Sequence, residues 1–197
     1  GKKMTIIAGI PSWVQMYFEK IITKQQTSIS KVFPELSLYV YGGVSYEPYK
    51  KMFERLFGKK IDTLATFPAS EGFFGYQDEF TEKEPDLLLL LNNDIFYEFI
   101  KTEDFLKGEH ERLSLEHVEL NVNYLLIIST SAGLWAYNIG DTVKFTSLKP
   151  YRLIVTGRVK HYLSAFGEHV IAEEVEKALS RALNNTDIII KEFTVAP

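Results

Sequence analysis

The hydrophobic pattern of the sequence changes near residue 71, and this change predicts two kinds of sheet in one chain. Before it, an apolar run at 36–41 ends on a Gly-Gly pair, an amphipathic helix pattern follows at 49–57, and a second apolar run covers 62–67. A strand, a crossover helix and another strand in that order favour parallel strands in a layered sheet. After residue 71 the apolar segments are short, aromatic or β-branched and separated by turn residues, which favours antiparallel strands.

The other predicted elements follow from the same periodicities. A helix from Trp13 to about Gln26 is predicted with Ser12 as its N-cap, and Ser45 is the N-cap candidate of the helix that Gly58 ends. The strands predicted in the second part are 73–80, 87–91, 95–100, 122–129, 133–139, 142–148 and 153–156, with hairpin connections at 92–94 and 131–133. A helix at about 170–183 and a strand at 188–195 end the chain. The expected fold class is α/β, a layered sheet with crossover helices plus a β-rich, barrel-like subdomain.

Composition excludes several classes of protein. With 46% hydrophobic and 14% aromatic residues the chain can bury a core, which excludes disorder. The 22 basic and 26 acidic residues give a net charge of -4, so neither nucleic acid nor an anionic membrane is an expected partner. The chain has no cysteine, which excludes thiolate nucleophiles and Cys-ligated metals. Nothing in the sequence indicates an oligomeric state.

No targeting or membrane pattern is recognisable. The longest apolar run, Leu87 to Leu91, is far shorter than the roughly 20 residues of a membrane span. No signal-peptide pattern opens the chain, so a cytoplasmic location is expected. The chain starts at Gly1 and passes almost at once into an apolar run, and we interpret it as entering partway through a domain, with a processed or engineered N-terminus.

Two patterns that could suggest sites have simpler interpretations. The four histidines, of which His110 and His117 lie in a predicted acidic helical stretch and His161 and His169 near the end, have no metal-ligand spacing. They are predicted to be solvated surface residues. The Ser/Thr/Gly-rich run 129–133 lacks the lysine of a phosphate-binding loop and lies between two predicted strands, so a hairpin turn is expected there.

Three clusters at strand ends could bind a nucleotide. At 42–45 a strand ends and a helix begins, which leaves backbone N–H groups available to a ligand; a plain tight turn is the alternative. Phe67, Ser70 and Glu71 offer an aromatic plane, a hydroxyl and a carboxylate, enough to stack a base and hold Mg²⁺ beside a phosphate, although ordinary loop chemistry explains them too. Asp141 follows a glycine between strands, where it could accept both ribose hydroxyls or cap its own turn.

In their order along the chain these clusters resemble the motifs of adenylate-forming enzymes, and in particular bacterial members of the auxin-responsive-promoter family of acyl-acid amido synthetases. The resembling segments are YGGVSYEPY at 41–49, ASEGFFGYQD at 69–78, IGDTVKFTSL at 139–148, and 157–174. The match through 139–174 is the most specific, and the resemblance covers nearly the whole chain. It implies a partial N-terminal adenylation domain at 1–156, a hinge at 157–160 and the start of a small α+β C-terminal domain at 161–197.

The resemblance also implies nucleotide-site roles. Phe67 would flank adenine, with Gly42 and Gly43 closing the same pocket. Ser70 and Glu71 would act on the α-phosphate, and Glu71 would hold Mg²⁺.

Further roles follow from the later motifs. Asp141, assisted by Arg158, would hold the ribose hydroxyls, and Tyr137 belongs to the same nucleotide motif. Lys160 matches the hinge position about which the C-terminal domain rotates between the two half-reactions. The acyl-pocket candidates, for each of which core packing is an equal interpretation, are Trp13, Val44, Phe73 and Phe74.

The implied chemistry has two steps. The carboxylate of a small acid attacks the α-phosphorus of ATP and releases pyrophosphate, and an amine, expected to be that of an amino acid, then displaces AMP to form an amide. Mg²⁺ and oriented donors would offset the developing charge. No protein nucleophile is required, which agrees with the absence of cysteine and of a Ser-His pair.

Two departures from the family keep other interpretations open. Ala136 and Asn138 stand where the family usually has arginine beside the motif tyrosine. The family's Ser/Thr/Gly-rich phosphate loop and most of its C-terminal domain are missing, so the chain is expected to be an inactive internal fragment. The alternatives are a ligase of the same superfamily that transfers an acyl or aryl group to coenzyme A, and a degenerate, non-catalytic nucleotide- or acyl-binding module.

Overall fold

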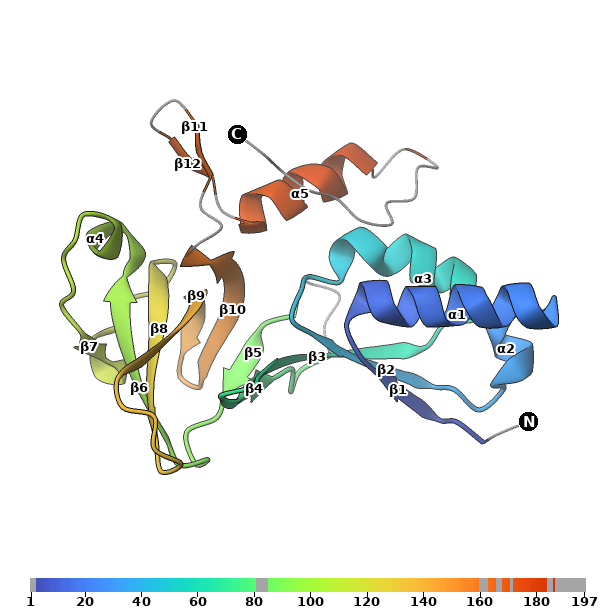
Figure 1. Ribbon diagram of the computed structural model, residues 1–197, viewed down its shortest axis with the longest axis horizontal. Helices are drawn as coiled ribbons and strands as arrows, with labels where there is room; N and C mark the ends of the chain where they lie inside the picture. The colour runs from blue at the N-terminus through green and yellow to red at the C-terminus, as the bar shows by residue number, and fades with distance from the viewer. Residues whose placement is uncertain are drawn as a thin grey trace. The chain divides into compact units, whose positions relative to one another are not determined.

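The computed structural model describes residues 3–80, 85–159, 163–165, 168–170, 172–183 and 186 (Figure 1). These residues form two compact units, which are described separately. The first runs to Thr66 and resumes at Glu176, and the second runs from Phe67 to Val175. Among the described helices, none combines the length and the hydropathy that a membrane crossing would need.

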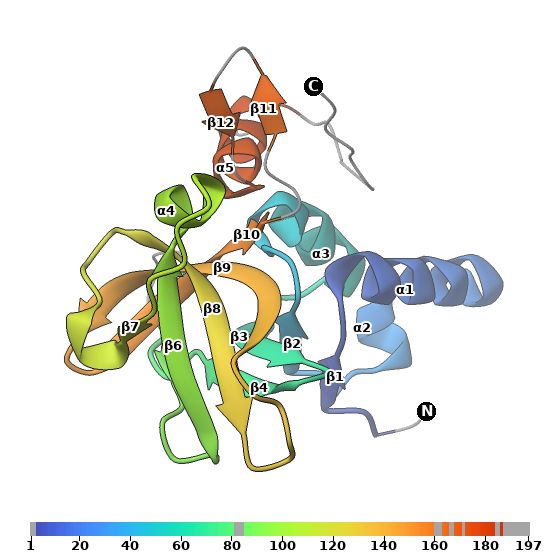
Figure 2. The ribbon, with the colours of Figure 1, turned by 60° about the vertical axis from the view of Figure 1, so that its left-hand side comes forward.

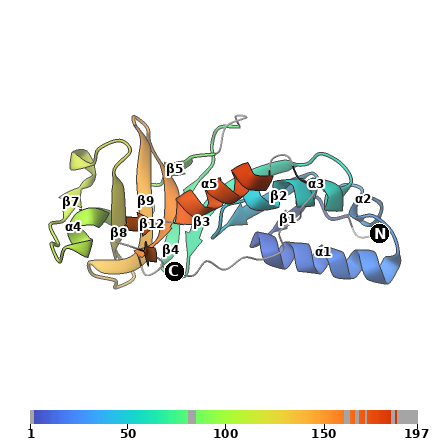
Figure 3. The same cartoon turned by 90° about the horizontal axis from the view of Figure 1, so that it is seen from above.

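The first unit is a parallel sheet covered by helices. β1 (Ile6–Ala8), β2 (Leu38–Gly42) and the first half of β3 (Asp62–Ala69) pair in parallel. The helices are α1 (Pro11–Gln25), α2 (Ile29–Val32) and α3 (Lys50–Phe57), and the 3₁₀ turn Glu47–Tyr49 precedes α3. Figure 3 shows α1 alongside α3. The predicted strand–helix–strand crossover with parallel pairing is confirmed.

Aromatic residues fill the space between this sheet and its helices. Tyr39 of β2 stacks on Phe53 of α3 with ring centroids 5.0 Å apart. Phe18 of α1 packs edge-on against Phe57 of α3 at 5.6 Å, and all four rings are buried. Full burial of such a side chain contributes about 1.5–3 kcal/mol relative to exposure. This packing holds β2 and α3, and therefore the loop between them, in place.

Both predicted serine caps in this unit are wrong. α1 begins at Pro11 with Ile10 in the N-cap position, and Ser12 lies inside the first turn. α3 begins at Lys50 behind a 3₁₀ turn that contains Pro48, so Ser45 caps neither element. A proline with its fixed φ and missing N–H suits the first turn of a helix, and in both places it marks the start that the serine was expected to mark.

The second unit is an antiparallel sheet. Its strands are β4 (Gly72–Tyr76), β5 (Leu87–Leu89), β6 (Ile95–Lys101), β7 (Leu113–Ser114), β8 (Asn123–Thr130), β9 (Tyr137–Leu148) and β10 (Tyr151–Arg158). Their hydrogen-bonded order is β4-β5-β10-β9-β8-β6-β7 (Figure 1), and Figure 2 shows β6, β8 and β9 side by side. The helix α4 (Thr102–Leu106) follows β6, and the 3₁₀ turn Leu115–His117 follows β7. The β-rich second part was predicted correctly, but the described strands form an open sheet, not a closed barrel.

Two details of this sheet differ from the sequence prediction. Residues 92–94 do not connect a hairpin, because β5 pairs with β4 and β10 whereas β6 pairs with β7 and β8. The two strands predicted at 133–139 and 142–148 are one strand, β9. The turn predicted at 131–133 does connect a hairpin, that of β8 and β9.

The last described elements are the antiparallel pair β11 (Leu163–Ala165) and β12 (Glu168–Val170), and α5 (Ala172–Leu183). The helix predicted at about 170–183 is confirmed as α5. The strand predicted at 188–195 lies outside the described residues. The division at 157–160 stays a prediction.

A buried arginine joins three elements of the second unit. The Arg152 side chain on β10 is 9% exposed and donates hydrogen bonds to Asp78 and Glu79, which follow β4. Asp86, just before β5, lies 3.8 Å from the same guanidinium, and its Oδ2 accepts a hydrogen bond from Thr146 of β9 at 2.7 Å. One cation therefore holds both ends of the β4–β5 connection against β10.

Candidate active site

The turn between β3 and β4 presents the first predicted pair. Ser70 and Glu71 form the two-residue link between strands that are neighbours in the sheet. The Ser70 side chain is exposed and Glu71 is half-buried. A hydroxyl and a carboxylate are thus held at a strand end, where a tight turn limits their freedom to move.

Asp141 and Arg158 form the centre of the predicted ribose site. The two residues lie directly opposite each other on β9 and β10. Arg158 Nε donates a hydrogen bond to Asp141 Oδ1 at 2.7 Å, and the guanidinium also donates to the carbonyl oxygen of Ile139 at 3.1 Å. The Asp141 side chain is 14% exposed and that of Arg158 57%. The carboxylate is therefore enclosed while its cation faces solvent.

The backbone before Asp141 turns sharply. Gly140 has φ +82°, a conformation that side chains other than glycine rarely adopt, although a Cβ there would meet no atom within 4 Å. Asn138 Oδ1 accepts a hydrogen bond from the N–H of Gly140 at 2.8 Å. The glycine is thus required by backbone conformation and not by crowding.

Three influences act on the carboxyl of Asp141. Burial raises its pKa and outweighs the hydrogen bond and charge of Arg158, which lower it. The negative charge of Glu71 raises the pKa further, which requires the two carboxylates to be within electrostatic reach of each other. The structure thus brings together three of the residues predicted from separate motifs, Glu71, Asp141 and Arg158.

The glycine loop lies in the other unit. Gly42 ends β2, and Gly43 has φ +83°. In the same unit, Val44 follows the glycine pair and is exposed, and the side chain of Trp13 on α1 is 71% exposed. Both side chains are accessible to an apolar ligand.

Phenylalanines predicted for the adenine and acyl sites divide between core and surface. Phe67 and Phe74 are buried and pack edge-to-face with ring centroids 5.0 Å apart. Phe73, which precedes Phe74 on β4 and points to the opposite face of the strand, is exposed. Phe74 thus packs in the core, one of the two interpretations given for it, and its part in an acyl pocket stays a prediction, as does the contact of Phe67 with adenine.

The residues around the motif tyrosine lie on the β8–β9 hairpin. Tyr137 is exposed at the start of β9. Ala136 has φ +45°, and its N–H donates a hydrogen bond to Ser129 Oγ at 2.9 Å. Lys160 lies outside the described residues.

Histidines gather at no metal site in the described part of the chain. Groups of three or more His, Cys, Asp or Glu able to hold a metal ion do not occur among these residues. His117 lies in the 3₁₀ turn after β7 and His110 in an irregular segment, so the acidic helical stretch predicted around them is wrong. His169 lies on β12.

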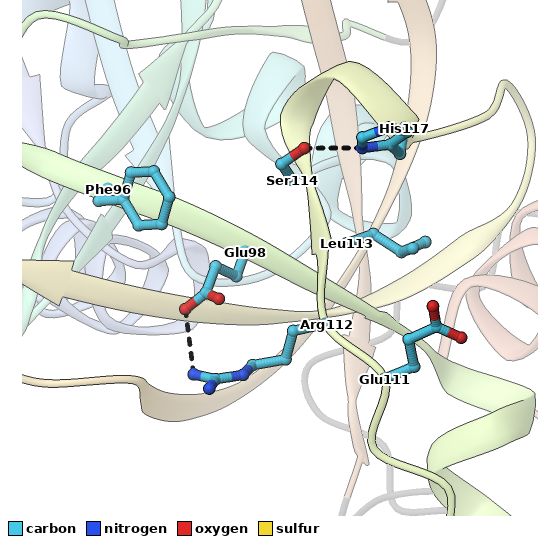
Figure 4. Close-up of a pocket in the computed structure, with 7 residues that line it drawn as sticks. All are labelled: Phe96, Glu98, Glu111, Arg112, Leu113, Ser114 and His117. Atoms are coloured by element: carbon cyan, nitrogen blue, oxygen red, sulfur yellow. Dashed lines mark hydrogen bonds and ion pairs between the residues drawn. The ribbon is translucent and has the colours of Figure 1, made fainter.

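A pocket of about 360 Å³ adjoins β6 and β7 away from the predicted motifs. Its lining is Phe96, Glu98, Glu111, Arg112, Leu113, Ser114 and His117 (Figure 4). Glu98 pairs with Arg112 at 3.2 Å, and Ser114 Oγ is hydrogen-bonded to His117 Nδ1 at 2.8 Å. These polar groups thus already have partners in one another.

Sequence reasoning missed the buried polar residues behind Asp141. Thr142 and Thr156 are fully buried and hydrogen-bonded through their side chains at 2.8 Å. Threonine is common in strands, so nothing in the sequence marks these two.

Comparison with known proteins agrees with this arrangement. Residues 88–158 match the sequence model of the GH3 family central domain. The chain is similar to the jasmonoyl–L-amino acid synthetase JAR4 of Nicotiana attenuata, with 33% identity over 121 residues. That alignment covers 59% of this chain and 21% of that protein, so the chain spans about a fifth of the length of this relative.

The similarity to solved structures covers more of this chain than the sequence similarity does. The acyl acid amido synthetase GH3.15 superposes with a TM-score of 0.69 at 13% identity, over 91% of this chain and 40% of that one. A 2-hydroxyisobutyryl-CoA ligase in its postadenylation state gives a TM-score of 0.65 at 15% identity, over 91% and 38%. The chain therefore has the mixed α/β fold of GH3 amido synthetases and related adenylate-forming ligases, and its residues 88–158 match the GH3 family central domain.

Proposed function

We propose that this chain is part of an ATP-dependent acyl-acid amido synthetase. The parent enzyme activates a carboxylic acid as its acyl-adenylate and transfers the acyl group to the amine of an amino acid. The bacterial origin, the internal position in a longer enzyme and the cytoplasmic location predicted from the sequence belong to the same proposal. The similarity to GH3 amido synthetases supports it.

The observation that carries the proposal is the ion pair of Asp141 and Arg158 across β9 and β10, in the unit that also contains Glu71. A carboxylate can accept hydrogen bonds from two vicinal hydroxyls, which is how acidic residues bind ribose in nucleotide sites. Arg158 donates a hydrogen bond to Asp141 from β10, and Glu71 lies close enough for its charge to act on the same carboxyl. In this proposal two strands and a turn supply the polar groups that bind the nucleotide.

In the proposed reaction the protein orients and stabilises. Ser70 binds the α-phosphate, while the substrate carboxylate forms a bond to phosphorus as the bond to pyrophosphate breaks. The amine then attacks the acyl carbon, AMP leaves with the bonding electrons, and the amine loses a proton. Oriented donors lower the barrier because negative charge develops on the oxygens of phosphorus and then of carbon. Lys160 is the proposed pivot between the two steps.

Glu71 is the proposed ligand of Mg²⁺. Magnesium is commonly held in proteins by one or two carboxylates together with the phosphates of the substrate, so a single half-buried glutamate beside a phosphate site fits its requirements. When bound, the ion would neutralise phosphate charge.

The substrate classes follow from the relatives and the exposed apolar residues. JAR4 is a jasmonoyl–L-amino acid synthetase by name, which joins a carboxylic acid to an amino acid. Trp13, Val44 and Phe73 offer accessible apolar surface for an acid, and Phe67, Gly42 and Gly43 are the proposed adenine-side residues.

Two other functions have specific support. The likeness to a 2-hydroxyisobutyryl-CoA ligase supports transfer to coenzyme A, and the product formed by the parent enzyme, thioester or amide, decides between them. The absence of a cation at Ala136 and Asn138 supports a non-catalytic binding module. Such a module would bind nucleotide weakly or not at all.

Calorimetric titration of the chain with AMP tests the nucleotide site. Asp141→Ala is expected to weaken binding about tenfold or more, because hydrogen bonds to a charged group contribute about 1.5–3 kcal/mol. Asp62→Ala, a change at the exposed start of β3, is the matched control and is expected to bind as the wild type does. Equal affinity of the wild type and Asp141→Ala would refute the assignment of Asp141.

A further inference from the structure

A buried chain of polar side chains joins three strands next to Asp141. The Thr156 hydroxyl of β10 lies 2.6 Å from Asn123 Oδ1 of β8 and 2.8 Å from Thr142 Oγ1 of β9. Thr142 and Thr156 are fully buried. Unpaired hydroxyls are costly at such a place, so the contacts have to be kept in the folded protein.

The donors and acceptors of this chain can be assigned. An amide oxygen only accepts, so the single proton of the Thr156 hydroxyl is donated to Asn123 Oδ1. Thr142 then donates its own proton to the Thr156 oxygen. Thr156 is thus the central member, and its hydroxyl is needed for both hydrogen bonds.

The polar chain lies where the strand register is irregular. Arg158 is opposite Asp141 and Gly157 is opposite Thr142, but the register shifts between Val155 and Gly157. A second shift, between Leu125 and Ile127 of β8, lies on the other side of β9. Bulges leave local pairing less constrained, and a slip of one residue turns each side chain to the other face of the sheet.

We propose that Thr156 is a positioning residue of the nucleotide site, which fixes the register that brings Arg158 onto Asp141. Thr142 directly follows Asp141 on β9, and Thr156 stands two residues before Arg158 on β10. The hydrogen bond between the side chains of the two threonines therefore constrains the backbone positions of both members of the ion pair. The inference rests on the proposed function, in which this pair binds ribose.

The test replaces hydroxyls while keeping shape. Thr156→Val removes the central hydroxyl at nearly constant volume, and Thr156→Ser restores it without the methyl group. Thr142→Val removes only the hydrogen bond to Thr156, and it replaces Thr156→Val as the test variant if Thr156→Val does not fold. Thr146→Val is the matched control, since Thr146 lies on β9 with Thr142 and its hydroxyl donates a hydrogen bond to the remote Asp86.

The first measurement compares the affinities for AMP and 2′,3′-dideoxy-AMP by calorimetry. The wild type is expected to prefer AMP about tenfold, as one or two hydrogen bonds to a carboxylate provide. In Thr156→Val this ratio should fall to about two or less with the affinity for the dideoxy nucleotide unchanged, because only the ribose contact is misplaced. Thr156→Ser and Thr146→Val should keep the wild-type ratio. A lower melting temperature with an unchanged ratio would mean a merely structural role and would overturn the proposal.

The second measurement needs no nucleotide. Titration of the Asp141 carboxyl by carbon-13 NMR should give a higher pKa in Thr156→Val than in the wild type, because the influence of Arg158 is weakened. An unchanged pKa in Thr156→Val, or in Thr142→Val if the first variant does not fold, contradicts the positioning role. If the wild type binds no AMP while the pKa still responds, the proposed function fails and the positioning of the ion pair stands.

Discussion

At the scale of single residues, burial raises the pKa of the Asp141 carboxyl, and two neighbours of opposite charge modify that increase. Arg158 on the next strand lowers its pKa, and Glu71 on the β3–β4 turn raises it, on top of the increase due to burial. The enclosed carboxylate is thus stabilised by a single exposed guanidinium. Small changes in either neighbour are therefore measurable at Asp141.

Removal of the two neighbours should shift the pKa of Asp141 in opposite directions. Arg158→Met is expected to raise it, because the hydrogen bond and the positive charge are lost, and Glu71→Gln is expected to lower it, because a negative charge is lost. Carbon-13 NMR of the Asp141 carboxyl measures both. Shifts in the same direction would mean that these side chains are not its dominant neighbours.

The same pKa has a consequence for stability. Because the pKa of Asp141 is raised in the folded protein, the native state holds this proton more tightly than the unfolded chain does. Its contribution to the free energy of unfolding is therefore fully present below the unfolded pKa of about 4 and decreases as pH rises through the native pKa. Arg158→Met should enlarge this decrease.

At the scale of elements, β10 carries a second, unrelated charge cluster. Arg152 lies within contact range of three carboxylates that flank the β4–β5 connection, and its own side chain is almost inaccessible. Loss of the cation would leave these carboxylates close together without compensation. The connection would then detach from β10 before the sheet itself opens.

Arg152→Met is expected to lower the free energy of unfolding by about 2 kcal/mol at pH 7, less than for a fully buried pair because the carboxylates are partly exposed. Arg112→Met is the matched control, since Arg112 pairs with Glu98 but is 46% exposed, and it should cost under about 1 kcal/mol. Urea unfolding measures both. Equal losses in the two variants would show that burial of the cation does not matter here.

Periodicity predicted the elements better than their connections. The parallel crossover around α3 was predictable because its helix stripe and flanking apolar runs are local patterns. The pairing of β5 with β10 was not, because residues more than 60 positions apart supply it, and the turn at 92–94 looks like any hairpin turn. The resemblance predicted that Arg158 assists Asp141, and the structure pairs the two residues, while their role toward a nucleotide stays a prediction. The threonines behind them were not predictable, because only the register of three strands brings their side chains together.

At the scale of the whole molecule, the chain contains only part of what its relatives contain. The alignments cover 21% of JAR4 and 40% of the GH3.15 structure.

The 197-residue chain is therefore expected to bind AMP but to catalyse no adenylation. Acid-dependent exchange of labelled pyrophosphate into ATP measures the first half-reaction, with a range of aliphatic and aromatic acids as substrates. The Asp141→Ala variant supplies the background. Exchange above this background by the purified chain would contradict the expectation and would place all groups required for adenylation within these residues.

The two tryptophans give each unit its own optical signal. Trp13 lies in the first unit and Trp135, 84% exposed, in the second, two residues before Tyr137. Because both indoles already face water, their emission should change little on unfolding but should respond to a ligand that covers them. Trp13→Phe leaves a fluorophore beside the proposed nucleotide motif, and Trp135→Phe leaves one among the proposed acid-binding residues. Two single-tryptophan proteins would thus report the two ligands separately.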